Sequence, residues 1–275
     1  NIRPKRRSEI LLKVTAIEEK MGVGSTLPFR VTCSDSKQYI MKGINASVPT
    51  GKALFNENFA AHFAGLVKLH TPFSTIGELS KELIDKTELK KYDFESGPCF
   101  LSTYLEGTSL RINRVVAKHI SNIEIIPDLI LFDTILMNSD RDGNEGNWFF
   151  TKEDNKLVVI DHTNIFRVAQ IWDVNTLTQD KTIPPLVLDE IKYGDNYHTL
   201  VQAYKYKYPR VHHPFSPMKR RINSLSIEKL KTCIDNIPIQ WGISEDEKDA
   251  ALDFVCFQID HIDDIIQELE KDFKF

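Results

Sequence analysis

The stretch Asn138-Ser139-Asp140-Arg141-Asp142-Gly143-Asn144-Glu145-Gly146-Asn147-Trp148 is the most informative part of this 275-residue chain. It places an acid and an amide ahead of an apolar, strand-like pattern, which ends in a second acid at Val159-Ile160-Asp161-His162. An acid that orients a hydroxyl, followed by an Asn and an Asp that hold a divalent metal, is the set of groups that phosphoryl transfer needs. Asp, Asn and Gly are also ordinary turn residues, so a turn without function is the alternative.

The pattern on either side of this stretch favours a metal site. Residues 148–151 and 157–160 read as two strands of a hairpin, turned at Asp154-Asn155. Asn147 enters this hairpin and Asp161 leaves it, so pairing of the strands would bring their side chains together. Oxygen ligands of this kind select Mg²⁺ or Mn²⁺ rather than zinc.

The first hundred residues read as strands around one helix. Strands are expected at 10–14, 29–33, 38–42 and 99–104, and a helix with an apolar face at about 53–69. Lys42 ends a strand and could reach phosphates, held there by Glu57 from the helix. The alternatives are a lysine exposed on an edge strand and a solvated glutamate.

A glycine-containing turn precedes the second strand. In Gly22-Val23-Gly24-Ser25-Thr26, backbone N–H groups and two hydroxyls could hold a phosphate. A hairpin turn without a ligand would have the same sequence. No Gly-Lys-Ser/Thr follows, so the turn is not a Walker A loop.

The remainder reads as mainly helical. Residues 78–95 are expected as surface helix or loop, and the pattern becomes helical from about Thr108. Pro127 opens a helix that runs into the acidic loop. Residues 170–190 are expected to be irregular, and 244–269 to form one amphipathic helix.

Composition excludes several classes of protein. The formal net charge of −4 gives no reason to expect direct binding to nucleic acid, and no apolar run is long enough to span a membrane. The four cysteines lie in apolar stretches without Cys-x-x-Cys spacing, which predicts buried, reduced thiols in a cytoplasmic protein. His212-His213 is expected at the surface. The sequence does not begin with Met, as expected of a processed chain or a fragment.

One basic stretch stands apart from this composition. Tyr204-Lys205-Tyr206-Lys207-Tyr208-Pro209-Arg210 interleaves cations with aromatic residues, and Lys219-Arg220-Arg221 follows. Such a pattern could suit RNA, an anionic lipid or an acidic protein. A solvated loop is the favoured alternative.

The motifs resemble those of a known family. Phe132 to Arg141, then Asn147-Trp148, then Ile160-Asp161-His162 resemble the HipA-like kinases and also the type II phosphatidylinositol 4-kinases. The Gly24-Ser25-Thr26-Leu27-Pro28 loop, the strand ending in Lys42, and Asn56-Glu57 on a helix are similar to HipA-like proteins as well. With the C-terminal helix, the resemblance covers most of the chain.

The resemblance implies a fold and a set of roles. The fold would be α+β, protein-kinase-like and two-lobed, with a small β-rich N-lobe at 1–107 and a larger, mainly helical C-lobe at 108–275. Asp140 would be the catalytic acid, and Asn147 and Asp161 the ligands of Mg²⁺ or Mn²⁺. The residues implied to bind ATP are Gly24, Ser25, Thr26, Lys42, Glu57 and, in the hinge, Ser102, Tyr104 and Leu105.

The spacing in the acidic loop departs from the family pattern. Protein kinases usually place the amide five residues after the acid, whereas Asp140 and Asn147 are seven apart. Asp142 lies five residues before Asn147, and Asn144 four after Asp140. Asp140 is favoured because it keeps the Asn-x-Asp-Arg context, and Asp142 is the alternative.

The resemblance also implies an activity. The expected function is ATP-dependent phosphorylation of Ser or Thr in a protein substrate or in the chain itself. A regulatory or antitoxin protein is an expected partner, because HipA-like toxins in toxin–antitoxin pairs are held by one. The alternatives are a catalytically silent nucleotide-binding module that acts through protein interaction, and a phosphoinositide kinase.

Overall fold

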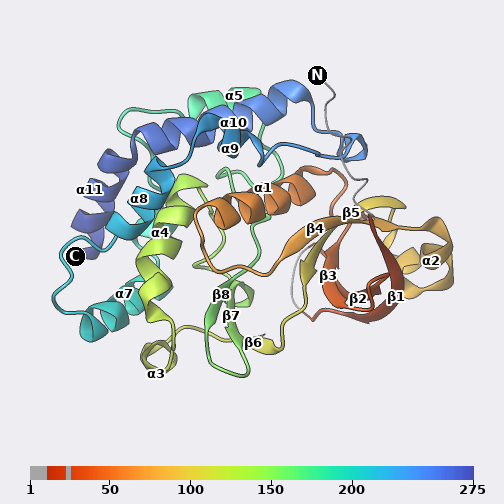
Figure 1. Cartoon of the computed structure of the whole chain (residues 1–275), viewed down its shortest axis with the longest axis horizontal. Coiled ribbons are helices and arrows are strands. Elements are labelled where there is room, and N and C mark those ends of the chain that lie inside the picture. Colours follow the sequence, from red (N-terminus) through yellow and green to blue (C-terminus); the bar gives the residue numbers. More distant parts are fainter. Residues whose placement is uncertain (1–10, 23–25) are drawn as a thin grey trace, which may run out of the picture. The chain divides into compact units, whose positions relative to one another are not determined.

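The structure, a computed structural model, describes residues 11–22 and 26–275 (Figure 1). The chain packs into two compact units. Unit 1 consists of Asn1–Pro49 and Ser74–Tyr104, and unit 2 of Thr50–Phe73 and Leu105–Phe275. The chain therefore passes from one unit to the other three times.

Unit 1 is built on a closed barrel in the strand order β1-β2-β3-β5-β4. Neighbouring strands run antiparallel except β1 and β4, which pair in parallel. The strands are β1 (Leu12–Lys20), β2 (Phe29–Cys33), β3 (Gln38–Lys42), β4 (Ser74–Leu79) and β5 (Gly97–Thr103). Two short helical segments follow β4, namely α2 (Lys81–Lys86) and η1 (Glu88–Tyr92).

Alternation along these strands forms the core of unit 1. Phe29, Val31 and Met41 are fully buried, and Tyr39 nearly so, because side chains two residues apart point to the same face of a strand. The expected hairpin of 29–33 and 38–42 is confirmed residue for residue. Strand β4 was not expected from the sequence, since Gly77 interrupts its short apolar pattern.

Unit 2 is mainly helical and holds one small sheet in the order β6-β7-β8. The strands are β6 (Gly107–Ser109), β7 (Trp148–Thr151) and β8 (Leu157–Val159). The helices are α1 (Lys52–Leu66), α3 (Arg114–Lys118), α4 (Ile126–Ile135), α5 (Val174–Gln179), α6 (Asp189–Lys192), α7 (Asp195–Lys207), α8 (Ser216–Asn223), α9 (Ile227–Lys231), α10 (Glu245–Asp260) and α11 (Ile262–Phe273), with short 3₁₀ segments at η2 (Ile123–Ile125), η3 (Glu145–Asn147) and η4 (Ile239–Trp241).

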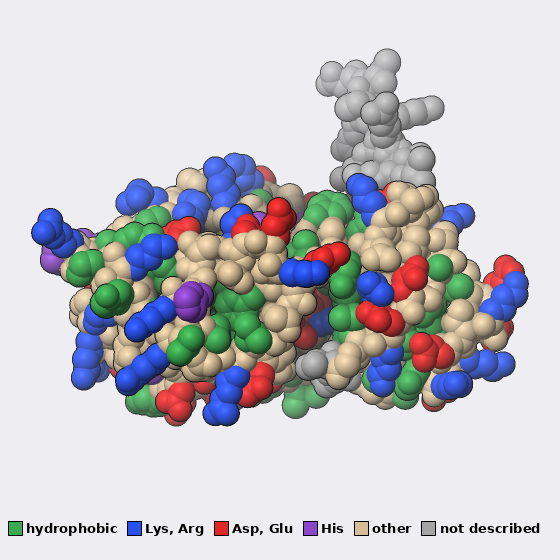
Figure 2. Space-filling view, turned by 90° about the horizontal axis from the view of Figure 1, so that it is seen from below, with side chains coloured by type: hydrophobic (Ala, Val, Ile, Leu, Met, Phe, Trp, Pro, Cys, Tyr) green, Lys and Arg blue, Asp and Glu red, His purple; other side chains and the backbone are tan. Residues whose placement is uncertain are grey.

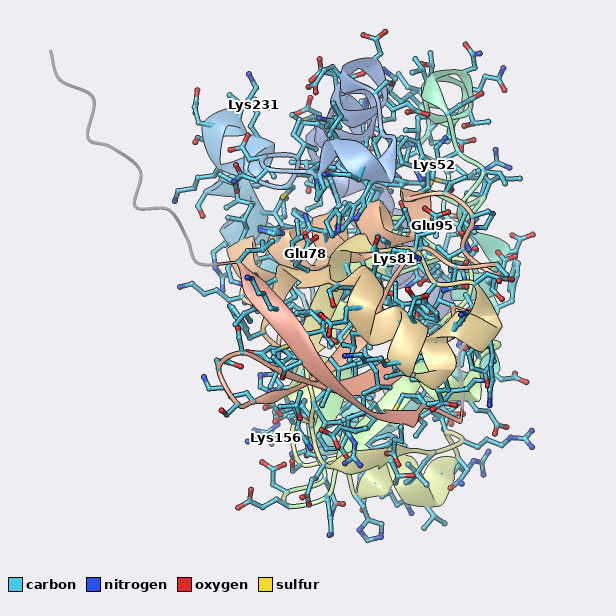
Figure 3. All side chains as sticks on the ribbon, turned by 90° about the vertical axis from the view of Figure 1, so that its right-hand side faces the viewer. Lys52, Glu78, Lys81, Glu95, Lys156 and Lys231 are labelled. Atoms are coloured by element: carbon cyan, nitrogen blue, oxygen red, sulfur yellow. The ribbon has the colours of Figure 1, made fainter. Side chains whose placement is uncertain are left out.

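Helix α1 is buried on nearly all sides within unit 2. Phe63 stacks on Phe132 of α4 with ring centroids 5.6 Å apart, and Phe55 packs on Trp172 at 5.4 Å. Gly51, at the N-cap of α1, packs directly against Trp241, and a Cβ at this position would overlap the backbone and side chain of that residue. Lys52, labelled in Figure 3, makes an ion pair with Glu247 of α10 (2.9 Å) and lies over the Trp172 ring.

Several expectations for unit 2 are corrected. Thr108 lies in strand β6 rather than in a helix, because Gly107–Ser109 pairs with β7. The segment 170–190 contains α5 and part of α6, where Asp173 provides a capping box for α5. The expected tail helix is two helices, α10 and α11, which meet at His261. The basic stretch from Tyr204 belongs largely to α7 and α8 and is not a loop.

Other expectations are confirmed. Helices begin near Ala53 and Pro127, and the hairpin turns at Asn155. Cys33, Cys99 and Cys233 are buried thiols and His212 and His213 are exposed, as expected, whereas Cys256 is only half-buried and departs from the expectation. No helix in the described residues combines the length and apolarity needed to cross a bilayer. The division into functional lobes at residue 107 stays a prediction.

Candidate active site

The acidic loop is anchored by a buried ion pair. Asp133 of α4 and Arg141 are almost fully buried, and the guanidinium makes two hydrogen bonds to the carboxylate, of 2.6 and 3.2 Å. Asn138 (3.0 Å) and the Tyr197 hydroxyl (2.8 Å) donate to the same carboxylate. Burial and then the charge of Asp133 raise the pKa of Tyr197 well above its usual value, so it remains a donor.

The same arginine ties together the two ends of the β7–β8 hairpin. Its Nη1 donates to the carbonyl of Asn147 (3.3 Å) and to that of Ile160 (2.8 Å), the residue before Asp161. Strand pairing of Trp148 with Val159 extends the same register. Asn147 and Asp161 are therefore held at one end of the hairpin, as their positions in the sequence predict.

The Asp140 carboxylate accepts hydrogen bonds from two side-chain amides of the same loop. Its Oδ2 accepts a hydrogen bond from Asn144 (2.9 Å) and one from Asn147 (3.1 Å). Asn144 is also the N-cap of the short helical turn η3, where its side chain accepts a hydrogen bond from the N–H of Gly146. The extra loop residues therefore fold back, and the amides four and seven residues after Asp140 converge on its carboxylate.

Asp142 has a different use. Its Oδ1 accepts from the N–H groups of Asn196 (3.0 Å) and Tyr197 (3.1 Å) in the first turn of α7. The helix needs this external cap because Gly194, at its N-cap position, has no side chain, and a Cβ there would overlap Asp142. Burial raises the pKa of Asp142, although the two N–H groups oppose the shift.

The segment after β8 is held by α1. Glu57 is 3% exposed, and its Oε1 accepts from the N–H of His162 (3.1 Å) and the hydroxyl of Thr163 (2.9 Å). Asn56 donates to the carbonyls of Thr163 (2.7 Å) and Ala169 (2.9 Å). The Oδ1 of Asn56 accepts from the indole of Trp172 at 2.9 Å.

Asp161 adopts the left-handed backbone conformation, with φ of 56°. Asp tolerates this region better than most residues, and strained backbone gathers at functional sites. Its Oδ1 accepts a 3.4 Å hydrogen bond from the N–H of Thr163, which closes an Asx turn. The turn brings the carboxylate back over the segment that Glu57 and Asn56 hold.

The expected phosphate-binding residues of unit 1 are placed as follows. Lys42 ends β3 between β2 and β5 and is 6% exposed, so the alternative of an exposed edge-strand lysine is wrong. Thr26 is buried, and its hydroxyl has no hydrogen-bond partner among the described residues, which fits a place for a ligand. Gly24 and Ser25 lie outside the described residues.

The expected hinge residues fall at the end of β5 and beyond. Ser102 lies in β5, opposite Ile40 and Ser74, and the N–H of Tyr104 donates to Gln38 (3.0 Å). Leu105 begins the next part of unit 2 and lines an open cavity of about 670 Å³ with His70, Glu106 and the β7–β8 turn. Their contact with adenine stays a prediction.

The donor set fits a metal that also binds phosphate. Among the described residues, no three His, Cys, Asp or Glu side chains gather to hold a metal without help. The side-chain nitrogen of Asn147 donates to Asp140, and no described residue donates to the side-chain oxygen Oδ1 of Asn147. One amide oxygen and the Asp161 carboxylate would leave most coordination positions to phosphate and water, as Mg²⁺ prefers.

The sequence does not predict the contacts of two groups of residues. Asn56 appeared only within a family motif, and because Glu57 and Asn58 follow it directly, the local sequence does not single out its buried contacts. The link from Asp133 to Tyr197 spans 64 residues and leaves no local pattern.

Comparisons with known proteins bear on the family and the fold. A family model described as HipA-like kinase matches residues 14–175, more than half of the chain. No curated protein matches. Among solved structures, the Helicobacter pylori proinflammatory kinase CtkA is 14% identical with a TM-score of 0.55, the match covering 90% of this chain and 94% of that one. The Golgi casein kinase is 11% identical with a TM-score of 0.50, over 96% and 73% of the two chains.

These structures are too distant in sequence to show more than the fold, but the family model covers the Asp140 loop, the β7–β8 hairpin and Asp161. The expected architecture is confirmed as a protein-kinase-like fold, with an N-terminal sheet followed by a mainly helical part. The chain belongs to the HipA-like kinase family.

Proposed function

We propose that this protein transfers the γ-phosphoryl group of ATP to a Ser or Thr hydroxyl of a protein substrate, or of the chain itself. The observation that carries the proposal is the pair of amides on Asp140. Asn144 and Asn147 fix its carboxylate at 2.9 and 3.1 Å, whereas Asp142 is committed to the start of α7. The family implies ATP and a divalent metal.

The residues would divide the work as follows. Asp140 orients the acceptor hydroxyl and takes its proton as the bond from the hydroxyl oxygen to the γ-phosphorus forms, while the bond from that phosphorus to the bridging oxygen breaks and ADP leaves. Asn147 and Asp161 would hold Mg²⁺ or Mn²⁺, which when bound offsets the charge on the phosphate oxygens. Lys42 would position the phosphates, with Thr26, Gly24 and Ser25 beside them. Pairing of Lys42 with Glu57 stays part of the proposal.

The assignment of Asp140 is tested with two matched variants. Asp140→Asn should lower the rate of ³²P transfer by about 10²–10⁴, because the proton acceptor is lost. Asp142→Asn should keep the rate within a few-fold, because an amide oxygen still accepts from Asn196 and Tyr197. The reverse order of effects would assign catalysis to Asp142.

The metal assignment has its own test. Asp161→Ala should abolish transfer, by several orders of magnitude, and weaken Mn²⁺ binding in the presence of ADP while the fold survives. Titration calorimetry and circular dichroism measure the last two quantities. Near-normal activity of Asp161→Ala would contradict the assignment.

One observation favours a second function. The seven-residue spacing from Asp140 to Asn147, where protein kinases usually have five, is the feature that favours a silent nucleotide-binding module. Such a module would bind Mg-ATP and transfer nothing to itself or to candidate proteins. No contact among the described residues favours a phosphoinositide as acceptor, and that alternative is not proposed.

A further inference from the structure

Positive charge is segregated within unit 2. The sequence has no Asp or Glu between Gly107 and Ile123, and none between Asn196 and Ile227, although acidic residues outnumber basic ones, 39 to 35, over the whole chain. The two acid-free segments carry nine Lys and Arg, namely Arg111, Arg114, Lys118, Lys205, Lys207, Arg210, Lys219, Arg220 and Arg221.

The fold brings the two segments together. Helix α3 packs against α7, and the Lys207 ammonium donates to the carbonyl of Ser121, just beyond α3, at 3.5 Å. Four exposed cations on this side have no acidic partner within salt-bridge distance among the described residues. They form what we call the α3–α7 basic surface: Arg114, Lys118, Lys207 and Arg210.

Four of the other five basic residues of these segments are engaged, among them Lys205, which donates to the carbonyl of Lys274. The fifth, Arg220 on α8, is exposed and has no acidic partner among the described residues. Arg221 pairs with Asp128, Lys219 with Asp263, and Arg111 with Glu145 (3.6 Å). Two exposed apolar side chains lie among the free cations, Val115 at 67% and Tyr206 at 83% exposure. Figure 2 shows blue Lys and Arg side chains interspersed with green ones over the left part of the face that includes α3 and α7.

This surface continues from the Asp140 loop. The Ser109 hydroxyl donates to the carbonyl of Gly146 (2.8 Å), and the N–H of Leu110 donates to the carbonyl of Trp148 (3.1 Å). Arg111 reaches Glu145 of the same loop. Helix α3 begins at Arg114, three residues after Arg111. An extended peptide of about 10 residues, up to roughly 35 Å long, could therefore reach from the Asp140 loop to the α3–α7 basic surface.

We propose that the α3–α7 basic surface binds an acidic stretch of the protein substrate, and so selects substrates with Asp and Glu near the accepted hydroxyl. The inference rests on the proposed function and names its substrate class. Unpaired cations beside exposed apolar groups match a peptide of mixed acidic and apolar residues, and such charge complementarity governs specificity and association rate.

The geometry disfavours nucleic acid and membrane as the occupant. Of the aromatic residues in the 204–210 stretch, Tyr204 is buried and Tyr208 is half-buried against it (5.2 Å), which leaves Tyr206 as a single stacking platform. Nucleic-acid binding needs several platforms in succession. A membrane needs a continuous apolar face, whereas Val115 and Tyr206 stand apart among cations.

The test measures binding without nucleotide, so it does not depend on catalysis. Two fluorescein-labelled peptides carry one Ser with six flanking Glu or six flanking Gln, and binding is followed by fluorescence anisotropy. The wild-type protein should bind the Glu peptide at least about tenfold more tightly at low salt, with the difference shrinking in 0.5 M NaCl.

A charge-matched pair of variants locates the site. Arg114→Glu/Lys118→Glu should remove the preference for the Glu peptide. Lys229→Glu/Lys231→Glu on α9 makes the same change in net charge at exposed positions and should keep the preference; Figure 3 labels Lys231 there. Circular dichroism verifies that both variants fold.

Three outcomes would overturn the inference: equal binding of the Glu and Gln peptides, an equal loss in the α9 control, or tighter binding to oligo(U) or to vesicles containing phosphatidylserine than to the Glu peptide. If the wild-type protein binds the Glu and Gln peptides equally but still transfers phosphate to the Gln peptide, this inference is overturned and the proposed function stands. Absence of any transfer, with the preference in binding intact, would remove only the proposed function.

Discussion

The two segments that carry the proposed metal ligands are held in place by different kinds of interaction. The loop at 138–147 depends on one buried ion pair, Asp133–Arg141, with each partner at most 1% exposed. The segment at 161–172 depends on neutral hydrogen bonds from Asn56 and on the Glu57 carboxylate. A buried ion pair fails as a unit when one partner is lost, whereas separate hydrogen bonds fail one at a time. Loss of one ion-pair partner should therefore disrupt the whole 138–147 loop, whereas loss of single hydrogen bonds should weaken the 161–172 segment step by step.

The largest effect is expected at the ion pair. Arg141→Met should destabilise the protein by about 3–5 kcal/mol, because Asp133 is left charged and buried without its partner. Urea denaturation measures the loss. The double variant Asp133→Leu/Arg141→Met should be less destabilised than either single variant. A double variant that loses the sum of the two single effects would mean that the pair does not act as a unit.

A smaller effect is expected at Asn56. Asn56→Leu should cost about 2–3 kcal/mol, because the carbonyls of Thr163 and Ala169 and the indole of Trp172 lose their partner. Hydrogen exchange should speed up mainly between residues 161 and 172, and Mn²⁺ with ADP should bind more weakly.

The matched control for Asn56 lies on the same helix. Asn58 is as buried as Asn56, yet its side-chain amide has no hydrogen-bond partner in the described residues. Asn58→Leu should therefore be neutral or stabilising and leave metal affinity unchanged. Equal effects of the two substitutions would show that α1 responds to any change of volume rather than to the contacts of Asn56.

A third variant probes the far side of the acidic loop. Gly194→Ala should cost about 1–3 kcal/mol, because the added methyl group overlaps Asp142 and the carbonyl of Glu190. The Gly194→Ala protein should have a lower melting temperature than the wild type. A second substitution, Asp142→Ala, should restore part of the difference because it removes the overlapping side chain. A Gly194→Ala protein as stable as the wild type would contradict the close approach of Asp142 to α7.

The smallest effect concerns pH. Burial raises the pKa of Asp142 in the folded state above its unfolded value. Its protonated form is thus favoured by folding, and this contribution to stability is present at low pH and lost as pH rises through the folded pKa. Asp142→Asn removes this dependence, so its stability relative to wild type should increase between pH 3 and pH 6, by no more than about the 1 kcal/mol of a helix cap. If the stability of Asp142→Asn relative to wild type instead fell between pH 3 and pH 6, the pKa of Asp142 would be lowered, not raised, by folding.

The elements predicted well from sequence are those with a complete local pattern. Strands 29–33 and 38–42 alternate without interruption, and the helix near 127 is marked by Pro127. The missed elements take their definition from distant partners. Strand β6 is three residues long and exists through pairing with β7, 40 or so residues later. The apolar spacing of the tail predicts one helix because it continues across the break at His261.

For the candidate site, residue type and order were predictable but the division of labour was not. Asp140 and Asp142 are both acids in one turn-rich loop, and local sequence cannot show that Asp142 caps a helix more than 50 residues away. The burial of Lys42 likewise follows from the packing of β3 within unit 1, and that of Glu57 from the packing of α1 within unit 2. The roles proposed for these side chains remain predictions.

The placement of α1 in unit 2 has a consequence for how the chain is synthesised. The helix is made early, between two parts of unit 1, yet it is covered by Trp172, Trp241 and Glu247. At a ribosomal rate of about 5–20 residues per second, its apolar side chains wait on the order of 10–40 seconds for these partners to emerge. During that interval the nascent chain presents a ready binding site for chaperones, and slowing translation after residue 70 should lengthen their stay.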